Sequence, residues 1–114
     1  MHDQRPNILF ILTDQQRRDS MRAYGNNWIE TPHLDNLADK SFIFENAYVT
    51  QPVCTPARAS IMTGLYPYST GLLRNGVPLS RDIQTIGDMI TDEYYNAHMG
   101  KWHLGDDMTA QHGL

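Results

Sequence analysis

Three stretches of the chain have the hydrophobic pattern of β-strands. Residues 7–13 are an almost unbroken apolar run, residues 41–50 are rich in aromatic and β-branched side chains, and residues 94–99 form a third, shorter stretch. A continuous apolar run of this length is typical of a parallel strand that is covered on both faces. The pattern therefore predicts three strands, at 7–13, 41–50 and 94–99, in an α/β fold.

Capping residues mark the start of two helices between these stretches. One is predicted to begin with Thr31 as N-cap and a proline at the first helical position. Its predicted apolar face is Leu34, Leu37 and Ala38. The other is predicted to begin at Thr85, which forms a capping-box pattern with Asp88. Its predicted buried stripe is Ile86, Met89 and Ile90.

The one cysteine of the chain stands at the start of a third predicted helix. Thr55 is the predicted N-cap, a proline follows at N1, and Gly64 ends the helix. Its predicted packed stripe is Ala57, Ile61 and Met62. Cys54 therefore lies at a helix N-terminus, which attracts anions, and Arg58 adds a permanent charge in the first turn. A soft nucleophile beside a cation at a helix N-terminus indicates a site for attack on a tetrahedral oxyanion.

This stretch resembles a known signature. Cys54-Thr55-Pro56-Ala57-Arg58, followed by Ile61-Met62-Thr63-Gly64, is similar to the Cys-x-Pro-x-Arg signature of the type I sulfatases. The resemblance implies that a formylglycine-generating enzyme oxidises Cys54 to formylglycine, whose hydrated aldehyde attacks the sulfur of a small-molecule or carbohydrate sulfate ester. It also implies that Arg58 holds that group in place. A buried free cysteine beside a surface arginine is the structural alternative.

The resemblance carries an expectation about the fold. The sulfatases belong to the alkaline-phosphatase-like superfamily, which has a mixed, mainly parallel sheet flanked by helices. Catalytic domains of this family run to several hundred residues. Residues 1–114 are therefore interpreted as the N-terminal part of a single catalytic domain, incomplete in itself.

A second signature follows the third predicted strand. Lys101-Trp102-His103 resembles the sulfatase segment whose lysine and histidine bind the sulfate oxygens, which makes both residues catalytic and substrate-binding candidates. If strand geometry continues, Lys101 and His103 face the same side, towards Cys54, and Trp102 turns into the core. The sequence departs from the family pattern upstream, at Glu93, Asn96 and Met99.

Asp14 follows the first predicted strand, at the edge where open α/β sheets bind ligands. The resemblance implies metal ligands here, usually two adjacent aspartates, but the second position holds Gln15. Its amide oxygen suits a hard cation without adding charge. The implied metal is Ca²⁺, or Mg²⁺ or Mn²⁺, and the oxygen on modified Cys54 is a third ligand. Taken alone, Asp14 is better explained as a turn or cap residue.

Residues 66–71 are predicted to be a loop, and Asn75-Gly76 a turn. Several sulfatase-like enzymes place an asparagine near this point that reaches the sulfate or its metal. Asn75 is therefore a candidate substrate-binding residue, with a plain turn residue as the alternative.

Composition excludes several classes of protein. Nine basic and thirteen acidic residues give a net charge of −4, without a basic run that would indicate nucleic acid. The run at 7–13 is too short to span a membrane, and one cysteine excludes an internal disulfide. No signal-peptide pattern is visible, so we expect a cytoplasmic protein, or a periplasmic or secreted one if a signal was removed.

Two other functions stay open. Phosphonate and phosphate mono- or diesterases of the same superfamily include formylglycine enzymes with Asp-Gln after the first strand, as at Asp14-Gln15 here. They tend to lack the Lys-x-His pair, which favours a sulfatase. From a different class, the chain could be a catalytically inactive piece, or a module that binds sulfated ligands.

Overall fold

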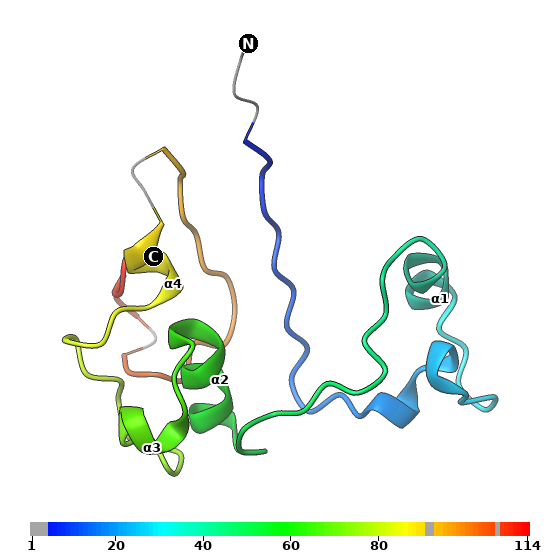
Figure 1. Cartoon of the computed structure of the whole chain (residues 1–114), viewed down its shortest axis with the longest axis horizontal. Coiled ribbons are helices and arrows are strands. Elements are labelled where there is room, and N and C mark those ends of the chain that lie inside the picture. Colours follow the sequence, from blue (N-terminus) through cyan, green and yellow to red (C-terminus); the bar gives the residue numbers. More distant parts are fainter. Residues whose placement is uncertain (1–4, 91–92, 107) are drawn as a thin grey trace. The chain divides into compact units, whose positions relative to one another are not determined.

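The computed structural model describes residues 5–90, 93–106 and 108–114 (Figure 1). The chain divides into two compact units, Met1–Asn46 and Ala47–Leu114. In the described parts, the first unit contains η1 (Arg18–Ser20), η2 (Arg22–Tyr24) and α1 (Pro32–Ala38), and the second contains α2 (Cys54–Thr63), α3 (Pro67–Thr70) and α4 (Ile86–Met89). None of the helices in these parts is long and apolar enough to cross a membrane.

Helix α1 of the first unit begins where the sequence predicts. Thr31 is its N-cap residue and Pro32 occupies N1. The Thr31 hydroxyl does not cap the helix backbone. Instead, it donates to Asp35 Oδ1 at 3.0 Å and accepts from the backbone N–H of Arg22 at 3.1 Å. This one hydroxyl therefore ties η2 to the first turn of α1.

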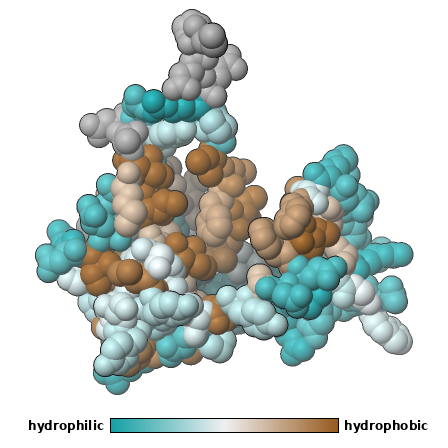
Figure 2. Space-filling model, in the orientation of Figure 1, coloured by the Kyte–Doolittle hydropathy of each residue, from teal (hydrophilic) through white to brown (hydrophobic). Residues whose placement is uncertain are grey.

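The predicted strands do not form within the described residues, where the structure assigns no β-strand. Residues 7–13, 41–50 and 94–99 have irregular backbone instead, and their apolar side chains face solvent, with Ile8 78% and Phe42 83% exposed. Figure 2 shows such apolar side chains on the molecular surface. A covered parallel strand needs neighbouring strands and a helix layer on each face. The apolar pattern alone cannot supply those partners.

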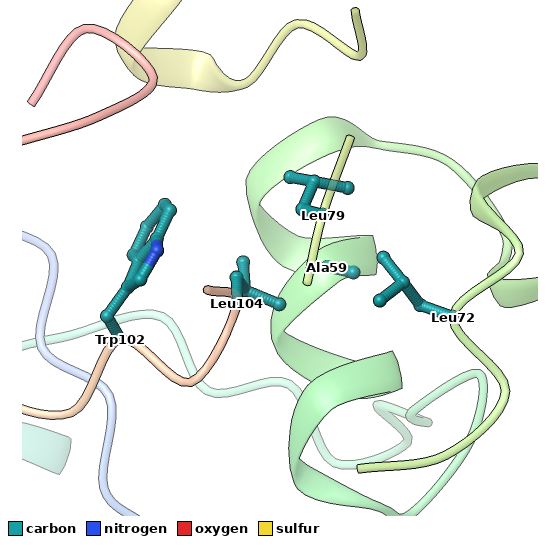
Figure 3. Close-up of a cluster of buried hydrophobic side chains, with 5 residues drawn as sticks. All are labelled: Ala59, Leu72, Leu79, Trp102 and Leu104. Carbon is teal, nitrogen blue, oxygen red and sulfur yellow. The ribbon is translucent and has the colours of Figure 1, made fainter. Parts of the chain in front are cut away.

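The core of the second unit gathers around α2. Ala59 is fully buried, and Leu72, Leu79 and Leu104 converge on it, with Trp102 beside them (Figure 3). Partly buried residues surround this cluster: Met62, Val77, Ile83 and Leu114.

The buried face of α2 differs from the predicted stripe of Ala57, Ile61 and Met62. Met62 packs against the core, as predicted. Ile61, however, is 42% exposed, and the buried face carries Thr55, Ala59 and Thr63, spaced four residues apart. These side chains are small, so the segments that bear the core leucines can approach the helix closely. The two threonines donate their hydroxyl protons to carbonyls, which removes the cost of burying them.

Two further predictions change in detail. Residues 66–71, predicted to be a loop, contain the short helix α3, which starts with proline at N1 and ends at Gly71 with φ +73°. At α4 the capping box of Thr85 and Asp88 is confirmed. Its predicted buried stripe is wrong, because Ile86 and Met89 are exposed. Gly87 is the buried α4 residue instead, since the backbone of His112 packs directly against it.

Candidate active site

Helix α2 begins at Cys54, two residues earlier than predicted. Val53 is the N-cap, in an extended conformation, and its carbonyl accepts the N–H of Ala57 at 2.9 Å, which closes the first turn. Thr55 is therefore the second helical residue and not the cap. Pro56 moves to the third position, where the missing N–H still costs nothing, because the first N–H groups of a helix have no partner within it. The thiol of Cys54 is half-buried at this end of the helix.

Asn75 supplies the cap that α2 lacks in its own sequence. Val53 has no side chain that can cap the helix, and the amide oxygen of Asn75 accepts the backbone N–H of Thr55 at 3.0 Å. The predicted Asn-Gly turn is confirmed, with Gly76 at φ +80°. Asn75 is thus a turn residue, and it also lies at the helix N-terminus beside Cys54.

Lys101 of the second signature contacts two residues of the first signature, Cys54 and Arg58. The ammonium of Lys101 lies 3.6 Å from the sulfur of Cys54. The guanidinium of Arg58, one turn along α2, donates to the backbone carbonyl of Lys101 at 2.6 Å. Arg58 thereby holds the backbone of the second signature against the helix that bears the first. This arrangement places one cationic side chain beside a potential nucleophile and a second one turn along the same helix, which suits an anionic substrate.

The segment around His103 does not keep strand geometry. His103 has φ +59°, in the left-handed region, so the simple alternation predicted from Lys101 to His103 fails at that residue. Trp102 is buried, as predicted, and so is Leu104. His103 lines a pocket of about 190 Å³ together with Gly76, Val77, Pro78, Gly105 and Asp106. Its surroundings therefore differ from those of Lys101, which contacts the thiol.

Asp14 and Gln15 belong to the first unit, whereas the residues that meet at Cys54 belong to the second. Both side chains are exposed, and Gln15 has φ +56°. Within the part of the chain that the structure describes, no group of three or more His, Cys, Asp or Glu residues could hold a metal ion. The metal site stays a prediction.

Thr55 also belongs to this site, although the sequence predicts it to be a helix N-cap. Its side chain is fully buried, and its hydroxyl donates to the backbone carbonyl of His103 at 3.0 Å. No sequence signal indicates this contact, because it joins two segments 48 positions apart. A threonine next to a cysteine at a helix start is most simply explained as a cap.

A polar cluster of the second unit lies outside the signature residues. Asp88 Oδ2 accepts the backbone N–H of Thr85 at 2.8 Å and lies 3.5 Å from Nδ1 of the buried His112. The hydrogen bond from the Thr85 N–H is the main reason that the pKa of Asp88 is lowered from its ordinary value. The cluster joins the start of α4 to the end of the chain, so its role is structural.

Comparison with known proteins agrees with the signatures. The sulfatase family model matches residues 6–113. An ulvan-active sulfatase of Formosa agariphila is 45% identical over 101 residues, which are 88% of this chain and 20% of that protein. An N-acetylglucosamine-6-O-sulfatase of Bacteroides thetaiotaomicron is 37% identical over 101 residues, covering 88% of this chain and 18% of that protein. The chain thus spans about a fifth of the length of these relatives.

A solved structure extends the similarity to the fold. The crystal structure of the sulfatase yidJ from Bacteroides fragilis matches with a TM-score of 0.80 at 37% identity, over 93% of this chain and 25% of that chain. The chain therefore shares the fold of the corresponding part of an alkaline-phosphatase-like enzyme. Together with the family match over residues 6–113, these likenesses show that the chain belongs to the sulfatase family.

Proposed function

We propose that the protein containing this chain is a sulfuric ester hydrolase whose nucleophile is residue 54, after a formylglycine-generating enzyme has oxidised Cys54. The observation that carries the proposal is the 3.6 Å contact between Lys101 Nζ and Cys54 Sγ. It brings the second signature onto the nucleophile position of the first, so that a cation lies where negative charge develops during the reaction. The sulfatase names of the relatives support the same class of bond.

Formylglycine at position 54 would supply a hydroxyl nucleophile for sulfur. The reaction breaks the bond between sulfur and the ester oxygen. The oxygen of residue 54 would form the new bond to sulfur, and the carbon–oxygen bond of residue 54 would then break to release sulfate. Water would restore the hydrated aldehyde and so replace the proton that leaves with the alcohol. Lys101 would bind a non-bridging sulfate oxygen through its ammonium. Arg58 would balance the remaining negative charge of the sulfate group. It would also keep the Lys101 backbone in place through the hydrogen bond to its carbonyl.

His103 would donate the proton to the departing oxygen. The pocket that it lines would then take the alcohol part of the substrate. At about 190 Å³ it is smaller than the roughly 300–1,000 Å³ of pockets that enclose a drug-sized ligand, so it suits a single ring. We therefore propose a small-molecule or carbohydrate sulfate ester as substrate, and the sugar-sulfatase names of several relatives support a carbohydrate. Asn75, beside the same helix N-terminus, is the proposed further contact to the sulfate.

Asp14 and Gln15 would hold a divalent metal, together with the oxygen on residue 54. A carboxylate and an amide oxygen are hard donors that suit Ca²⁺, and also Mg²⁺ or Mn²⁺. Ca²⁺ takes about six to eight oxygen ligands, so the other ligands of this site would come from further parts of the protein. When bound, the metal would neutralise charge on a sulfate oxygen.

For the whole protein we propose a mixed, mainly parallel sheet flanked by helices, of which residues 1–114 form the N-terminal part. The exposed apolar side chains of residues 7–13, 41–50 and 94–99 support this proposal, because they are the side chains that such a sheet would bury. The 0.80 TM-score to yidJ supports it as well.

A second candidate function is hydrolysis of a phosphonate or phosphate ester. The pair Asp14-Gln15 favours it, because formylglycine enzymes of that kind carry Asp-Gln at this position. The Lys101 and His103 pair weighs against it. The two functions differ in the element that is attacked and share the nucleophile, so one assay with paired substrates separates them.

The test uses the complete protein, co-produced with a formylglycine-generating enzyme, on phenyl sulfate and phenylphosphonate esters that share a leaving group. We expect a higher kcat/KM on the sulfate ester and loss of turnover on both esters in Cys54→Ala. A preference for the phosphonate ester would select the second function. Turnover that survives Cys54→Ala would overturn both.

A further inference from the structure

We infer that Thr55 is a positioning residue for His103: its buried hydroxyl fixes the backbone from which the imidazole projects. This inference rests on the proposed role of His103 as proton donor to the leaving alcohol. It assigns to Thr55 a task beyond its place in the Cys-x-Pro-x-Arg signature. The contact that carries it is the 3.0 Å hydrogen bond from Thr55 Oγ1 to the His103 carbonyl.

His103 needs such support because of its backbone conformation. A φ of +59° lies in the left-handed region, which residues with a side chain rarely adopt. A strained residue of this kind persists only where its surroundings hold it, and it is typical of functional sites. The Thr55 hydroxyl holds the carbonyl of His103, and the backbone N–H of Leu79 holds the next carbonyl, that of Leu104, at 2.7 Å.

Thr55 is itself fixed at both ends. Its side chain is 0% exposed, and its backbone N–H donates to the amide oxygen of Asn75 at 3.0 Å. It directly follows Cys54 in the first turn of α2. A rigid residue therefore links the nucleophile position to the His103 backbone, and the relative placement of nucleophile and proton donor depends on it.

Thr63 shows that this link is not the default for a buried threonine of α2. It lies on the same face as Thr55 and is also buried, but its hydroxyl donates to the carbonyl of Ala59, within the helix, at 2.7 Å. Thr55 has no helical carbonyl four residues before it, because α2 begins at Cys54. Its hydroxyl therefore reaches another segment. Thr63→Val is the matched control, since it also removes one buried hydroxyl from the same helix face.

The experiment compares two substrates in the complete enzyme. One is a sugar sulfate, whose alcohol leaves poorly without a proton, and the other is nitrophenyl sulfate, whose leaving group needs little protonation. Thr55→Val keeps the side-chain shape and removes the hydroxyl, whereas Thr55→Ser keeps the hydroxyl. Thr55→Ala is a second route to removal of the hydroxyl if the valine variant folds poorly. Mass spectrometry of position 54 normalises each kcat to the modified fraction.

We expect Thr55→Val to lower kcat on the sugar sulfate by roughly 10-fold or more, with little change on nitrophenyl sulfate and in KM, because a misplaced general acid matters most for the poor leaving group. Thr55→Ser and Thr63→Val should keep the ratio of the two kcat values within about twofold of the wild type. An equal loss on both substrates, or a ratio that Thr63→Val changes as much as Thr55→Val, would overturn the inference.

A second measurement keeps this test separate from the proposed function. If the wild-type protein hydrolyses neither ester, the proposed function fails, and the positioning of His103 is then read by NMR. The imidazole Cε1–H resonance of His103, assigned with His103→Gln, should move in Thr55→Val and stay in place in Thr55→Ser and Thr63→Val. An unchanged resonance in Thr55→Val would overturn the inference whatever the activity.

Discussion

Lys101 and Cys54 lie 47 positions apart in the chain, and the Lys101 ammonium is 3.6 Å from the Cys54 sulfur. The contact depends on the Arg58 guanidinium, which binds the Lys101 carbonyl and so keeps this residue next to the first turn of α2. A flexible lysine side chain gains little from a distant anion in water, whereas a short contact with an anion is stronger. The position of Lys101 is therefore the first thing to test.

Lys101→Ala in the complete enzyme should lower kcat on an aryl sulfate by on the order of 100-fold, because it removes one positioned donor to the sulfate oxygens. The fold should persist, since the Lys101 side chain is exposed. Steady-state kinetics measures the turnover, and circular dichroism shows whether the fold persists. Lys40→Ala, at another exposed lysine, is the control and should keep wild-type turnover. Wild-type turnover in Lys101→Ala would remove this residue from the site.

Asn75→Ala should lower the free energy of unfolding by about 0.5–2 kcal/mol, the usual effect of losing a helix N-cap. The physical reason is that the Thr55 N–H loses its acceptor at the start of α2. Asn75→Asp keeps an acceptor oxygen and adds a negative charge at a helix N-terminus, so it should stay close to the wild type. Urea unfolding of the three proteins compares them. Equal stability of Asn75→Ala and the wild type would show that the cap contributes nothing.

The cap that Asn75 provides also shows why the sequence predicts some features and misses others. The start of α1 at Thr31-Pro32 and the capping box of Thr85 and Asp88 are local, because each joins residues within one turn, and both are confirmed. The Asn75 cap joins residues 20 positions apart, so the sequence predicts the turn at Asn75 and not its partner. The start of α2 shifts by two residues, because Val53, which has no capping side chain, adopts an extended backbone and becomes the N-cap.

The predicted strands stay unconfirmed for a different reason. The apolar pattern of residues 7–13 indicates a segment that is covered on both faces. A β-strand, however, forms only where a neighbouring strand supplies hydrogen bonds. The described residues supply no such neighbour, and the side chains from Ile8 to Leu12 remain exposed. At the site, the signatures predict that Lys101 approaches Cys54. The positive φ of His103 follows from tertiary hydrogen bonds that no local pattern encodes.

The pH dependence of stability should include a contribution from Asp88. Hydrogen bonds from Thr85, with a smaller effect of the nearby His112, lower the pKa of this carboxyl in the folded state. An ionised Asp88 therefore stabilises the fold above its unfolded-state pKa of about 3.9, and this stabilisation is lost as the pH falls through the lower folded-state value. Asp88→Asn lacks the titration. The difference in unfolding free energy between wild type and Asp88→Asn should be constant from about pH 7 to 5 and shrink below about pH 4.

A difference that stays constant down to about pH 3 would contradict this account of Asp88. Asp82→Asn is a suitable control for the loss of a surface carboxylate, because Asp82 is exposed in the same unit and lies outside the Thr85 and His112 cluster. Its unfolding free energy, measured over the same pH range, shows how much of the change comes from net charge alone.

We propose that residue 54 becomes the nucleophile through oxidation of Cys54, and mass spectrometry of the peptide that contains it tests this directly. The protein is produced with and without a formylglycine-generating enzyme and digested with a protease. We predict that co-production converts Cys54 to formylglycine, whereas Arg58→Ala, which breaks the Cys-x-Pro-x-Arg pattern, lowers the converted fraction. Unmodified cysteine at position 54 in the co-produced wild-type protein would contradict the account.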